Sequence, residues 1–565
     1  MSVNLGARAG AAPRSTFAVD ALVLCALGAL VAGLVTLAHR WAAPLQATVA
    51  IDLSPAALPG YTLLSLARGF AAYLLSLAVT LVYGTAAAHR PAAARILIPL
   101  LDVLQSIPVL GFLPGVVLGL VALVPHRNLG LELACVVMIF TGQAWNMIFS
   151  FYGSLRNIPA ELHEVARIFR MTTWQRFRML EVPSAATGLV WNSMMSMAGG
   201  WFFLTVAEAF TLGDHDFRLP GIGSYMSVAI DHGDRRAMVA AVVAMAVMIV
   251  ATDQLVWRPL VVWTERFKLE ESAGAEKPHS WVLDLLSRSG LLRRLGAVLG
   301  ARPPLLARAT PAPAAAPNRA VGRLVMALAL AGTTAGVVQL GRLLIQVPAA
   351  GWAQVAAGLA ATALRTSGAV LLAALWTVPI GILVGRSPAV AHRVEPIVQL
   401  LASFPAPMLY PIVTAALAVL HLPFALTAML LMLLGAQWYV LFNVIAGAGA
   451  IPADLREAAD TCRLTGWPRW RTLELPVVFP YLVTGLVTAA GGAWNASIVA
   501  EMVRFRGTTL TTTGLGALIT QATTAGDFPL LTAGVLTMAL TVVTLNRLGW
   551  RRLYRLAETR YALER

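Results

Sequence analysis

Two glutamates near the ends of long apolar runs are the first residues in this sequence that could do chemistry. Glu208 follows the run WFFLTVA, and Glu501 follows NASIVA in a matching position 293 residues later. An ionisable side chain at membrane depth is a functional candidate, because an unpaired charge there costs free energy. The pair could bind a ligand, act as a gate, or hold the following loop by hydrogen bonds. We weigh the structural or gating role above direct binding of a ligand.

Patterns that would let this chain catalyse a reaction by itself are missing from the sequence. His163–Glu164 resembles the start of a zinc-binding HExxH motif, but the fifth position is Arg167, so no pair of histidines forms. The only lysines are Lys268 and Lys277, and neither follows a glycine, which excludes a GxxxxGK[ST] phosphate loop. We therefore predict no catalytic residue, no metal site and no cofactor in this chain. If ATP drives the protein, another chain must hydrolyse it.

The composition places the elements around these residues in a membrane. Of the 565 residues, 58% are hydrophobic and 12% are charged, whereas soluble domains carry about 25% charged residues. Apolar runs of about 20 residues recur, and each is long enough to cross a bilayer as a helix. We therefore predict an all-α polytopic membrane protein with about 12 transmembrane helices. These spans lie near 17–38, 61–87, 97–124, 129–152, 185–210, 236–263, 321–346, 361–386, 396–420, 424–447, 476–502 and 528–549.

The predicted spans fall into two homologous halves of six. Ser106 and Pro108 recur as Ser403 and Pro405, 297 residues later. Further pairs keep an offset of 293: Glu164 and Glu457, Trp174 and Trp467, Pro183 and Pro476, Trp201 and Trp494, and Glu208 and Glu501. Chance similarity between apolar helices would not keep one register through loops as well as spans. Because each half has an even number of spans, the repeat fits two halves in the same orientation.

The loop between the fourth and fifth spans of each half carries the most informative pattern. The first loop reads IPAELHEVARIFRMTTWQRFRMLEVPSA and the second reads IPADLREAADTCRLTGWPRWRTLELPVV. Each predicts a short helix with an acidic first turn, then a turn near Thr172–Trp174 or Gly466–Trp467, and then a second amphipathic segment that ends at a proline. A short helix–turn–helix at a membrane surface is not the arrangement of an enzyme site, but it suits the docking of a partner.

The distribution of arginine orients the chain. In the second half, the loops near 386–395, 448–475 and 547–565 hold twelve arginines, whereas the opposite loops hold two. Since short cytoplasmic loops retain basic residues, we place both termini, the linker 264–320 and both patterned loops in the cytoplasm. The net charge of +15 reflects the same bias, so we predict contact with membrane lipid and no nucleic-acid partner.

In these loops the chain resembles the permease subunits of ABC importers. The signature of that family is Glu-Ala-Ala, three residues, Gly, nine residues, Ile, any residue and Leu-Pro. Glu457–Ala458–Ala459 with Pro476 matches at this spacing, and Glu164–Val165–Ala166 with Pro183 matches more loosely. The later stretches AEAFTLGDHDFRLPGIGSYM and AEMVRFRGTTLTTTGLGALI look like permeases of the nitrate, sulfonate, taurine and bicarbonate group.

The resemblance implies a type I importer permease with two permease domains fused in one chain. In that family the first helix of the loop is the coupling helix, which sits in a cleft on the ATPase subunit. The resemblance therefore implies a homodimeric ABC ATPase that binds ATP and Mg, an extracytoplasmic solute-binding protein, and a bacterial inner membrane location. It further implies a small anion such as nitrate, sulfonate, taurine or bicarbonate, or a small organic solute.

The resemblance assigns coupling to residues in both loops. They are Glu161, Glu164, Val165, Ala166, Arg170, Trp174 and Pro183, and Glu457, Ala458, Ala459, Arg463, Gly466, Trp467 and Pro476. Glu164 and Glu457 could cap helix starts, pair with the partner, or both. The family's glycine falls at Arg170 and Arg463, so the tight turn is predicted to shift to Thr172–Thr173 or Thr465–Gly466.

Candidates for the solute path or its gates occupy matching positions in the two halves. They are Ser106, Pro108, Trp201 and Glu208, and Ser403, Pro405, Trp494 and Glu501. The paired prolines could mark broken helices that line the path, or they could be packing kinks, and both interpretations stay open. The tryptophans could line a cavity, although close packing of helices at the neighbouring glycines is favoured.

The predicted organisation has six parts. They are an N-terminal tail and first helix (1–60), a first permease domain (61–263), a cytoplasmic linker (264–320), a seventh helix and loop (321–360), a second permease domain (361–550) and a cytoplasmic tail (551–565). The main alternative is a secondary transporter driven by an ion gradient, which would be expected to carry a relay of carboxylates or histidines deep in its spans. An enzyme acting on lipid would need a paired nucleophile and base, which the spans lack.

Overall fold

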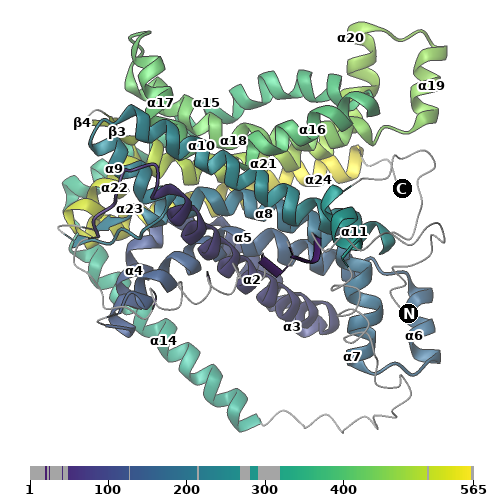
Figure 1. The fold of residues 1–565 in the computed structure, drawn as a ribbon, viewed down its shortest axis with the longest axis horizontal. Helices are drawn as coiled ribbons and strands as arrows, with labels where there is room; N and C mark the ends of the chain where they lie inside the picture. Colours follow the sequence, from purple (N-terminus) through teal and green to yellow (C-terminus); the bar gives the residue numbers. More distant parts are fainter. Residues whose placement is uncertain are drawn as a thin grey trace.

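A computed structural model describes residues 49–125, 127–212, 215–267, 280–289, 319–505 and 508–561, with a few residues between 19 and 41. These residues form a bundle of long helices that run roughly side by side (Figure 1). The predicted first span, 17–38, and most of the predicted linker, 264–320, lie outside the described residues.

Long apolar helices dominate the first half. Its elements are α2 (Leu58–His89), α3 (Pro91–Ser106), η1 (Val109–Phe112), α4 (Leu113–Leu123), α5 (Leu129–Arg156), α6 (Ala160–Ile168), α7 (Thr173–Arg176), η2 (Phe177–Glu181), α8 (Val182–Glu208), α9 (Ile222–Asp231), α10 (Arg235–Thr252), η3 (Asp253–Trp257), α11 (Arg258–Thr264) and η4 (Glu265–Phe267). The long helix α5 packs between α2 and α8. These three helices therefore form the core of the half.

The second half repeats this order of elements. After α12 (Trp281–Ser287) in the linker come α14 (Arg319–Ile345), α15 (Ala349–Gly385), α16 (Pro388–Ser403), α17 (Ala406–Ala418), α18 (Phe424–Gly449), α19 (Ala453–Thr461), α20 (Gly466–Arg469), η5 (Trp470–Glu474), α21 (Leu475–Ala500), α22 (Leu515–Ala525), α23 (Phe528–Leu545), η6 (Asn546–Trp550) and α24 (Arg551–Arg560). Here α18 packs between α15 and α21, as α5 does in the first half. The repeated packing matches the internal repeat that the sequence predicts.

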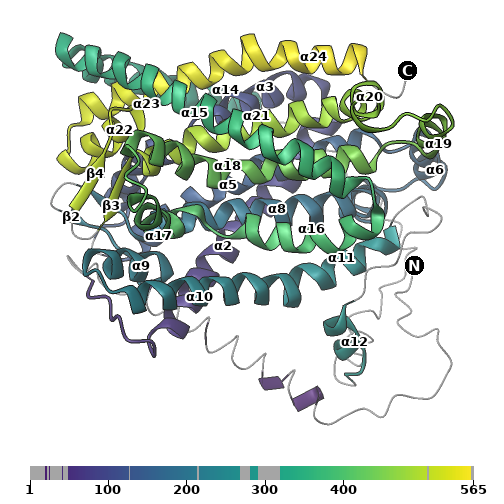
Figure 2. The same ribbon diagram turned by 90° about the horizontal axis from the view of Figure 1, so that it is seen from above.

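The two ends of the bundle differ in structure. At one end each half has a two-stranded antiparallel hairpin, β1 (Thr211–Leu212) with β2 (His215–Asp216) and β3 (Met502–Phe505) with β4 (Thr508–Thr511). The short helices α6 and α19 lie at the opposite end, as both ribbon views show (Figures 1 and 2). We call the end with the hairpins the hairpin end and the other the loop end.

Seven helices within the described residues are long and apolar enough to cross a membrane, or eight if a bent pair counts as one span. The bent pair is α16 and α17, which meet at 88°. The predicted third spans of the two halves, 97–124 and 396–420, are thus broken in the structure, which is one of the two interpretations left open for the paired prolines. A proline follows each break point by one residue, at Pro108 and Pro405, and the residue before a proline is disfavoured in helical geometry.

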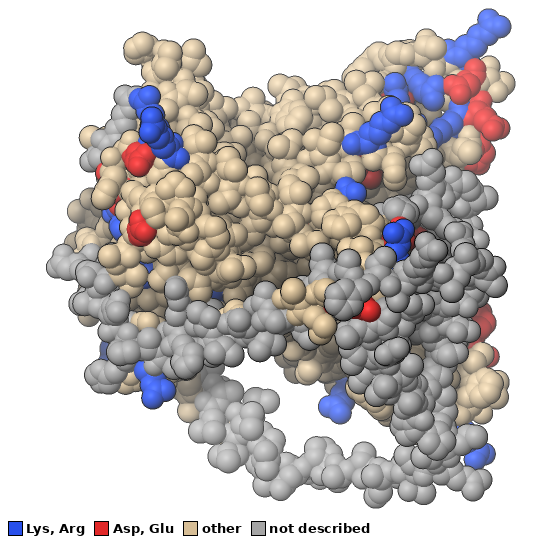
Figure 3. All heavy atoms as spheres, in the orientation of Figure 1, with Lys and Arg blue, Asp and Glu red and all other residues tan. Residues whose placement is uncertain are grey.

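The outer surface of the bundle is suited to lipid. Large apolar side chains point outward from α2 and α15, among them Leu63, Val82, Leu364 and Leu371. In the view of Figure 3 the charged side chains gather toward the two ends, and the surface between them is mostly uncharged. An apolar band between polar ends is the pattern of a protein that spans a bilayer.

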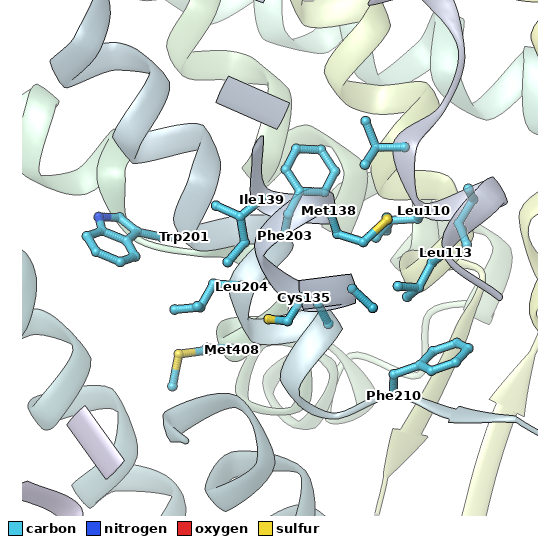
Figure 4. Close-up of a cluster of buried hydrophobic side chains, with 14 of the residues drawn as sticks. Leu110, Leu113, Cys135, Met138, Ile139, Trp201, Phe203, Leu204, Phe210 and Met408 are labelled. Carbon is cyan, nitrogen blue, oxygen red and sulfur yellow. The ribbon is translucent and has the colours of Figure 1, made fainter. Parts of the chain in front are cut away.

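The main buried cluster joins the two halves. Trp201 and Leu204 of α8 lie near Cys135 and Ile139 of α5, and Met408 of α17 comes into the same cluster from the second half (Figure 4). Trp494 and Leu515 also belong to it. The halves are therefore packed on each other through a shared apolar core.

Candidate coupling loops and solute path

The first coupling loop, residues 158–183, begins with a short helix and a tight turn. In α6 the first turn carries Glu161, where free backbone N–H groups favour a carboxylate. At the other end Arg170 N–H donates to the carbonyl of Arg167 (2.9 Å) and Met171 N–H donates to that of Ala166 (3.0 Å). Arg170 is in the left-handed region, with φ 47°. This pair of bonds is the Schellman ending of a helix.

The second coupling loop, residues 451–476, ends its first helix in the same way. In α19, Arg463 N–H donates to the carbonyl of Asp460 (3.0 Å) and Leu464 N–H donates to that of Ala459 (2.9 Å). Arg463 is also left-handed, with φ 50°. Leu464 packs against a small buried cluster that contains Ala459. The backbone of the turn is therefore repeated in the two halves.

The predicted shift of the turn is wrong. Both loops turn at the arginine that replaces the family's glycine, so the bend does not move to Thr172–Thr173. A non-glycine residue in the left-handed region costs roughly 1–2 kcal/mol, and the two closing hydrogen bonds offset it by satisfying helix carbonyls. In the second loop Gly466 is left-handed as well, with φ 58°, so a further bend follows there.

The helices α6 and α19 turn equivalent faces inward. Ala166 and Ala459 are buried, whereas Glu164 and Glu457 are exposed. Glu161, Val165 and Ala458 are exposed too. Both helices begin after a proline without a side-chain cap, so among the described residues neither Glu164 nor Glu457 caps its helix. Their carboxylates remain accessible to a partner.

The second segment of each loop exposes a tryptophan. Trp174 is 66% exposed and Trp467 is 68% exposed. In the first loop Trp174 stacks on Phe177, with ring centroids 5.6 Å apart. Thr172 and Gln175 form a capping box at the start of α7. Within the described part of the chain, no side chain caps the matching helix α20, so the first loop has a capping interaction here that the second lacks.

A buried glutamate anchors each loop to the neighbouring long helix. The Glu181 carboxylate lies 2.8 Å from His89 Nε2, at the end of α2, and 2.8 Å from Arg176 Nε. Glu474 accepts a hydrogen bond from Arg386 Nε (2.6 Å), just beyond α15, and its carboxylate lies 3.3 Å from Arg469 Nε. Both glutamates are almost fully buried. A displacement of either loop therefore bears directly on α2 or α15.

These anchors were missed by sequence reasoning. Glu181 and Glu474 keep the offset of 293, but His89 and Arg386 keep the offset of 297 and differ in residue type. The glutamates lie in π-helical turns, η2 and η5, which end just before the prolines Pro183 and Pro476 in α8 and α21. A proline lacks the N–H that a regular helix would use, and such wide turns accommodate the missing bond.

At the hairpin end, Glu208 is the centre of a buried polar cluster. It accepts hydrogen bonds from Ser65 Oγ (2.7 Å), Arg68 Nη1 (2.7 Å) and the backbone N–H of Gly223 (2.9 Å). The Arg68 guanidinium also donates from Nε to Glu132 (2.6 Å). We call these residues the first outer clasp, because they tie α2, α5 and α8 to the start of α9.

Glu501 forms a second outer clasp with the same plan. It accepts hydrogen bonds from Thr362 Oγ1 (2.8 Å), Arg365 Nη1 (2.5 Å) and the backbone N–H of Gly516 (2.9 Å). Arg365 also donates to Thr512 Oγ1 (3.1 Å). Both glutamates are fully buried. These bonds hold each glutamate against the segment that follows it; the structural or gating role weighed above ligand binding remains a prediction.

Glycines are required beside both clasps because the backbone comes very close. A Cβ on Gly221 would lie 2.3 Å from the Glu208 carboxylate, and one on Gly514 would lie 2.1 Å from that of Glu501. The arginines of the clasps were missed by the sequence, although Arg68 and Arg365 keep the offset of 297. A single arginine within an apolar run, repeated in both halves, was the signal that could have found them.

The halves meet at the broken helices. Ser106 ends α3, and the backbone N–H of Val109 donates to Asn495 Oδ1 of the other half (2.8 Å). Ser403 ends α16, one residue before the break to α17. At the hairpin end, Asp231 lies 3.1 Å from Arg218 Nη2 and 3.3 Å from Arg504 Nη1 of the second half. The prolines thus mark true breaks in helices at the interface.

A cavity of about 260 Å³ lies between the halves at these breaks. Residues of both halves line it, and none of its described lining residues is charged. Its polar groups include amides and indoles, from Gln105, Asn146, Trp145, Trp438 and Asn495. Of the predicted path residues, Pro108, Ser403 and Trp494 line this cavity. It can hold a small solute through neutral hydrogen-bond donors and acceptors.

A second cavity of about 590 Å³ adjoins the first, since Gln399 and Ser403 line both. It lies between α8, α10 and α11 of the first half and α16 of the second, and Trp201 lines it. It also contains ionisable groups: Asp253, Arg258, Glu265, His392 and Glu395. Pro405, Glu208 and Glu501 line neither cavity.

Comparison with known protein families gives this arrangement its context. The family described as the binding-protein-dependent transport system inner membrane component matches residues 63–256 and again 377–560, which together are more than half of the chain. The chain belongs to this family. It is therefore a multi-pass ABC importer permease with two fused permease domains, and the family is one of transport proteins and not of enzymes. Both coupling loops lie inside the matched ranges.

Individual relatives of this permease are named as permeases for different solutes. The nitrate import permease protein NrtB of Leptolyngbya laminosa is 28% identical over 190 residues, 34% of this chain and 64% of that protein. The bicarbonate transport system permease protein CmpB of Synechocystis is 32% identical over 133 residues, which are 23% of this chain and 46% of that protein. The riboflavin transport system permease protein RibX of Chloroflexus aurantiacus is 33% identical over 106 residues, which are 19% of this chain and 37% of that protein. The chain spans less than two thirds of the length of each.

Proposed function

We propose that this permease couples to a separate ATPase dimer through its two cytoplasmic coupling loops and conducts a small solute inward. The single observation that carries this proposal is the repetition of one loop geometry, with a left-handed arginine in each half, at the same end of the bundle. Two equivalent projections suit a partner with two equivalent clefts. The ATPase, and not this permease, would bind ATP and Mg.

The anchors indicate how a movement of the ATPase would reach the spans. Each buried glutamate, Glu181 or Glu474, connects its loop to the end of α2 or α15. The same helices carry Arg68 and Arg365 of the outer clasps, 21 residues before His89 and Arg386 respectively. A displacement of both loops would therefore move α2 and α15, and with them α5 and α18, which pack on these helices and line the cavity between the halves.

The solute would enter at the hairpin end, where we expect an extracytoplasmic solute-binding protein to dock. The positive-inside distribution of arginine supports this orientation, with both termini in the cytoplasm of a bacterial inner membrane. Relatives are named as permeases for nitrate import and for bicarbonate and riboflavin transport. The candidate solutes are therefore small anions, including sulfonates and taurine, or small organic solutes. The uncharged central cavity suits transient contact through amides and indoles.

The buried carboxylates do not favour an ion-gradient mechanism. A proton or sodium relay needs carboxylates that can change partners during transport. Glu208 and Glu501 are each held by an arginine, a hydroxyl group and a backbone N–H. Such a set of bonds fixes a structure.

Purification of the tagged permease from mildly solubilised native membranes tests the proposal. The wild type is expected to retain about two ATPase subunits per chain, which hydrolyse ATP. Glu164→Arg combined with Glu457→Arg should release them or uncouple their ATP turnover, because both exposed carboxylates lie on the predicted docking helices. As a matched control, reversing Arg552 and Arg560 to glutamate on the exposed helix α24 should leave the subunits bound.

The proposal fails if wild-type permease retains no ATPase and uptake into vesicles follows a proton or sodium gradient. It also fails if the double reversal on the coupling loops leaves both ATPase binding and coupled uptake unchanged.

A further inference from the structure

The two coupling loops share a backbone but differ in the side chains that they expose. At the end of α6, Ile168 is 77% exposed and Phe169 is 72% exposed. The matching positions at the end of α19 are Thr461 and Cys462, which are also exposed. Large apolar side chains held in water are a common mark of a surface that another protein covers. Only the first loop carries such a pair at this point.

The charges of the two loops differ as well. Arg167 in the first loop corresponds to Asp460 in the second. Asp460 is paired with Arg469 of its own loop. The matching Arg176 of the first loop pairs with the buried anchor Glu181, as Arg469 also does with Glu474. Arg167 is exposed beside the apolar pair. At these positions the first loop therefore offers a cation and two large apolar side chains, whereas the second offers two smaller side chains and an aspartate that is paired within its own loop.

The position of the apolar pair favours a protein partner over lipid. The loops project from the end of the bundle, beyond the helices that would cross a membrane (Figures 1 and 2). The apolar residues that suit lipid lie along the sides of α2 and α15 instead. A partner seated on the end of the bundle would cover Ile168 and Phe169, while a bilayer around its sides would not.

We propose that the first coupling loop is the main anchor of the ATPase and that the second is a weaker, salt-sensitive contact. This inference rests on the proposed function. Buried apolar residues near the centre of an interface carry most of the binding free energy, whereas exposed charge pairs add little and are screened by salt. The ATPase cleft that receives the first loop presents an apolar pocket with an acidic rim, facing Ile168, Phe169 and Arg167. The ATPase pair thus docks asymmetrically on a permease with two similar halves.

Exchanging side chains between the loops tests this inference with controls that the chain itself supplies. The first variant carries Ile168→Thr and Phe169→Cys, and the second carries the reciprocal Thr461→Ile and Cys462→Phe. The ATPase chain that copurifies with the wild type is isolated, identified by its ATP hydrolysis, and titrated back onto each permease at low and high salt. All four side chains are exposed, so unchanged thermal unfolding in detergent verifies that each variant is folded.

The wild type is expected to bind the ATPase in two steps, the weaker of which is lost at high salt. The first variant should lose the salt-resistant step, with an affinity about tenfold lower or more. The reciprocal variant should make the weaker step about as strong as the first and resistant to salt.

Equal effects of the two exchanges, or no effect of the first, would overturn the inference. So would an exchange that alters binding to vesicles of anionic lipid and leaves ATPase binding unchanged. A failure of the proposed function has a different signature, since wild-type permease would then bind no ATPase at either salt concentration.

Discussion

The outer clasps and the coupling loops are both repeated in the two halves, but the clasps repeat their side chains and the loops repeat their backbone conformation. The clasps keep their residues: Glu208 and Glu501 accept from Arg68 and Arg365, beside glycines at matching positions. The loops keep their backbone, including the left-handed arginines, while some exposed residues, such as Arg167, Ile168 and Phe169, change in type or charge. Burial constrains side chains at the hairpin end, because every polar atom there needs a partner. Exposure leaves the loops free to fit their partners.

The two clasps also differ in one respect. In the first, Arg68 is shared by Glu208 and Glu132, whereas in the second Arg365 meets Glu501 and then the hydroxyl group of Thr512. The first clasp therefore balances two carboxylates on one guanidinium. Its stability depends more strongly on that arginine.

The largest effect that would sharpen this comparison is expected from Arg68→Leu. Removing one partner of a buried ion pair typically costs about 3–5 kcal/mol, and here two buried carboxylates lose their cation. Arg365→Leu leaves only one buried carboxylate, that of Glu501, without its cation, so it should destabilise the protein less. Thermal unfolding of the purified variants in detergent compares the two directly. Equal losses would show that Glu132 does not depend on Arg68.

A smaller but still clear effect is expected where the clasp glycines gain a methyl group. In Gly514→Ala the new Cβ would overlap the Glu501 carboxylate, and such overpacking typically costs about 1–3 kcal/mol. Gly221→Ala should behave alike beside Glu208. Gly153→Ala in α5 is the matched control, because among the described residues no atom outside the local helix backbone lies within 4 Å of its added Cβ. If all three variants unfolded at the same temperature, the close approach of each glycine to its glutamate would not contribute to stability.

At the loop end, the anchor should matter more than the surface pair beside it. Glu474→Gln removes the charge that holds Arg386 and Arg469, and loss of a buried hydrogen-bonded charge costs about 1–3 kcal/mol. We expect ATP hydrolysis to continue while uptake falls, because the loop no longer moves α15. Asp460→Asn is the control, since its side chain is 66% exposed and its pair with Arg469 is worth about 0–1 kcal/mol.

Simultaneous assays of ATP hydrolysis and uptake in proteoliposomes separate these outcomes. Should Glu474→Gln retain full uptake per ATP, the anchor would be only a packing feature of the loop.

Much of the fold could be predicted because apolar runs and paired landmarks are local signals. The sequence left open whether Pro108 and Pro405 break or only kink the spans 97–124 and 396–420, because hydropathy does not change across them. The structure shows breaks at both prolines. The clasps were missed by the sequence analysis. Arg68 and Glu208 lie 140 residues apart and belong to different registers of the repeat, so only the fold brings them together.

The coupling residues could be located but not oriented from sequence. Glu164 and Trp174 are exposed, whereas Ala166 is buried. The spacing of the motif alone does not tell which of its residues are exposed and which are buried. The turn was misplaced because the missing glycine was taken to move it. The hydrogen bonds of Met171 and Leu464 keep it in place, since a helix ending depends on backbone bonds as well as on residue preference.

The smallest effect is expected from restoring glycine at these turns, and it would test whether the loops are repeated through their backbone. Arg170→Gly removes the steric cost of the left-handed conformation, offset in part by glycine's larger loss of chain entropy, for a net gain of roughly 0.5–1 kcal/mol. The arginine side chain is exposed, so little packing is lost. Hydrogen exchange at the Met171 amide, which closes the turn, should slow by a few-fold, and Arg463→Gly should do the same at Leu464. Faster exchange in either variant would mean that the arginine side chain itself holds the turn, and that the two loops are alike for a reason other than their backbone.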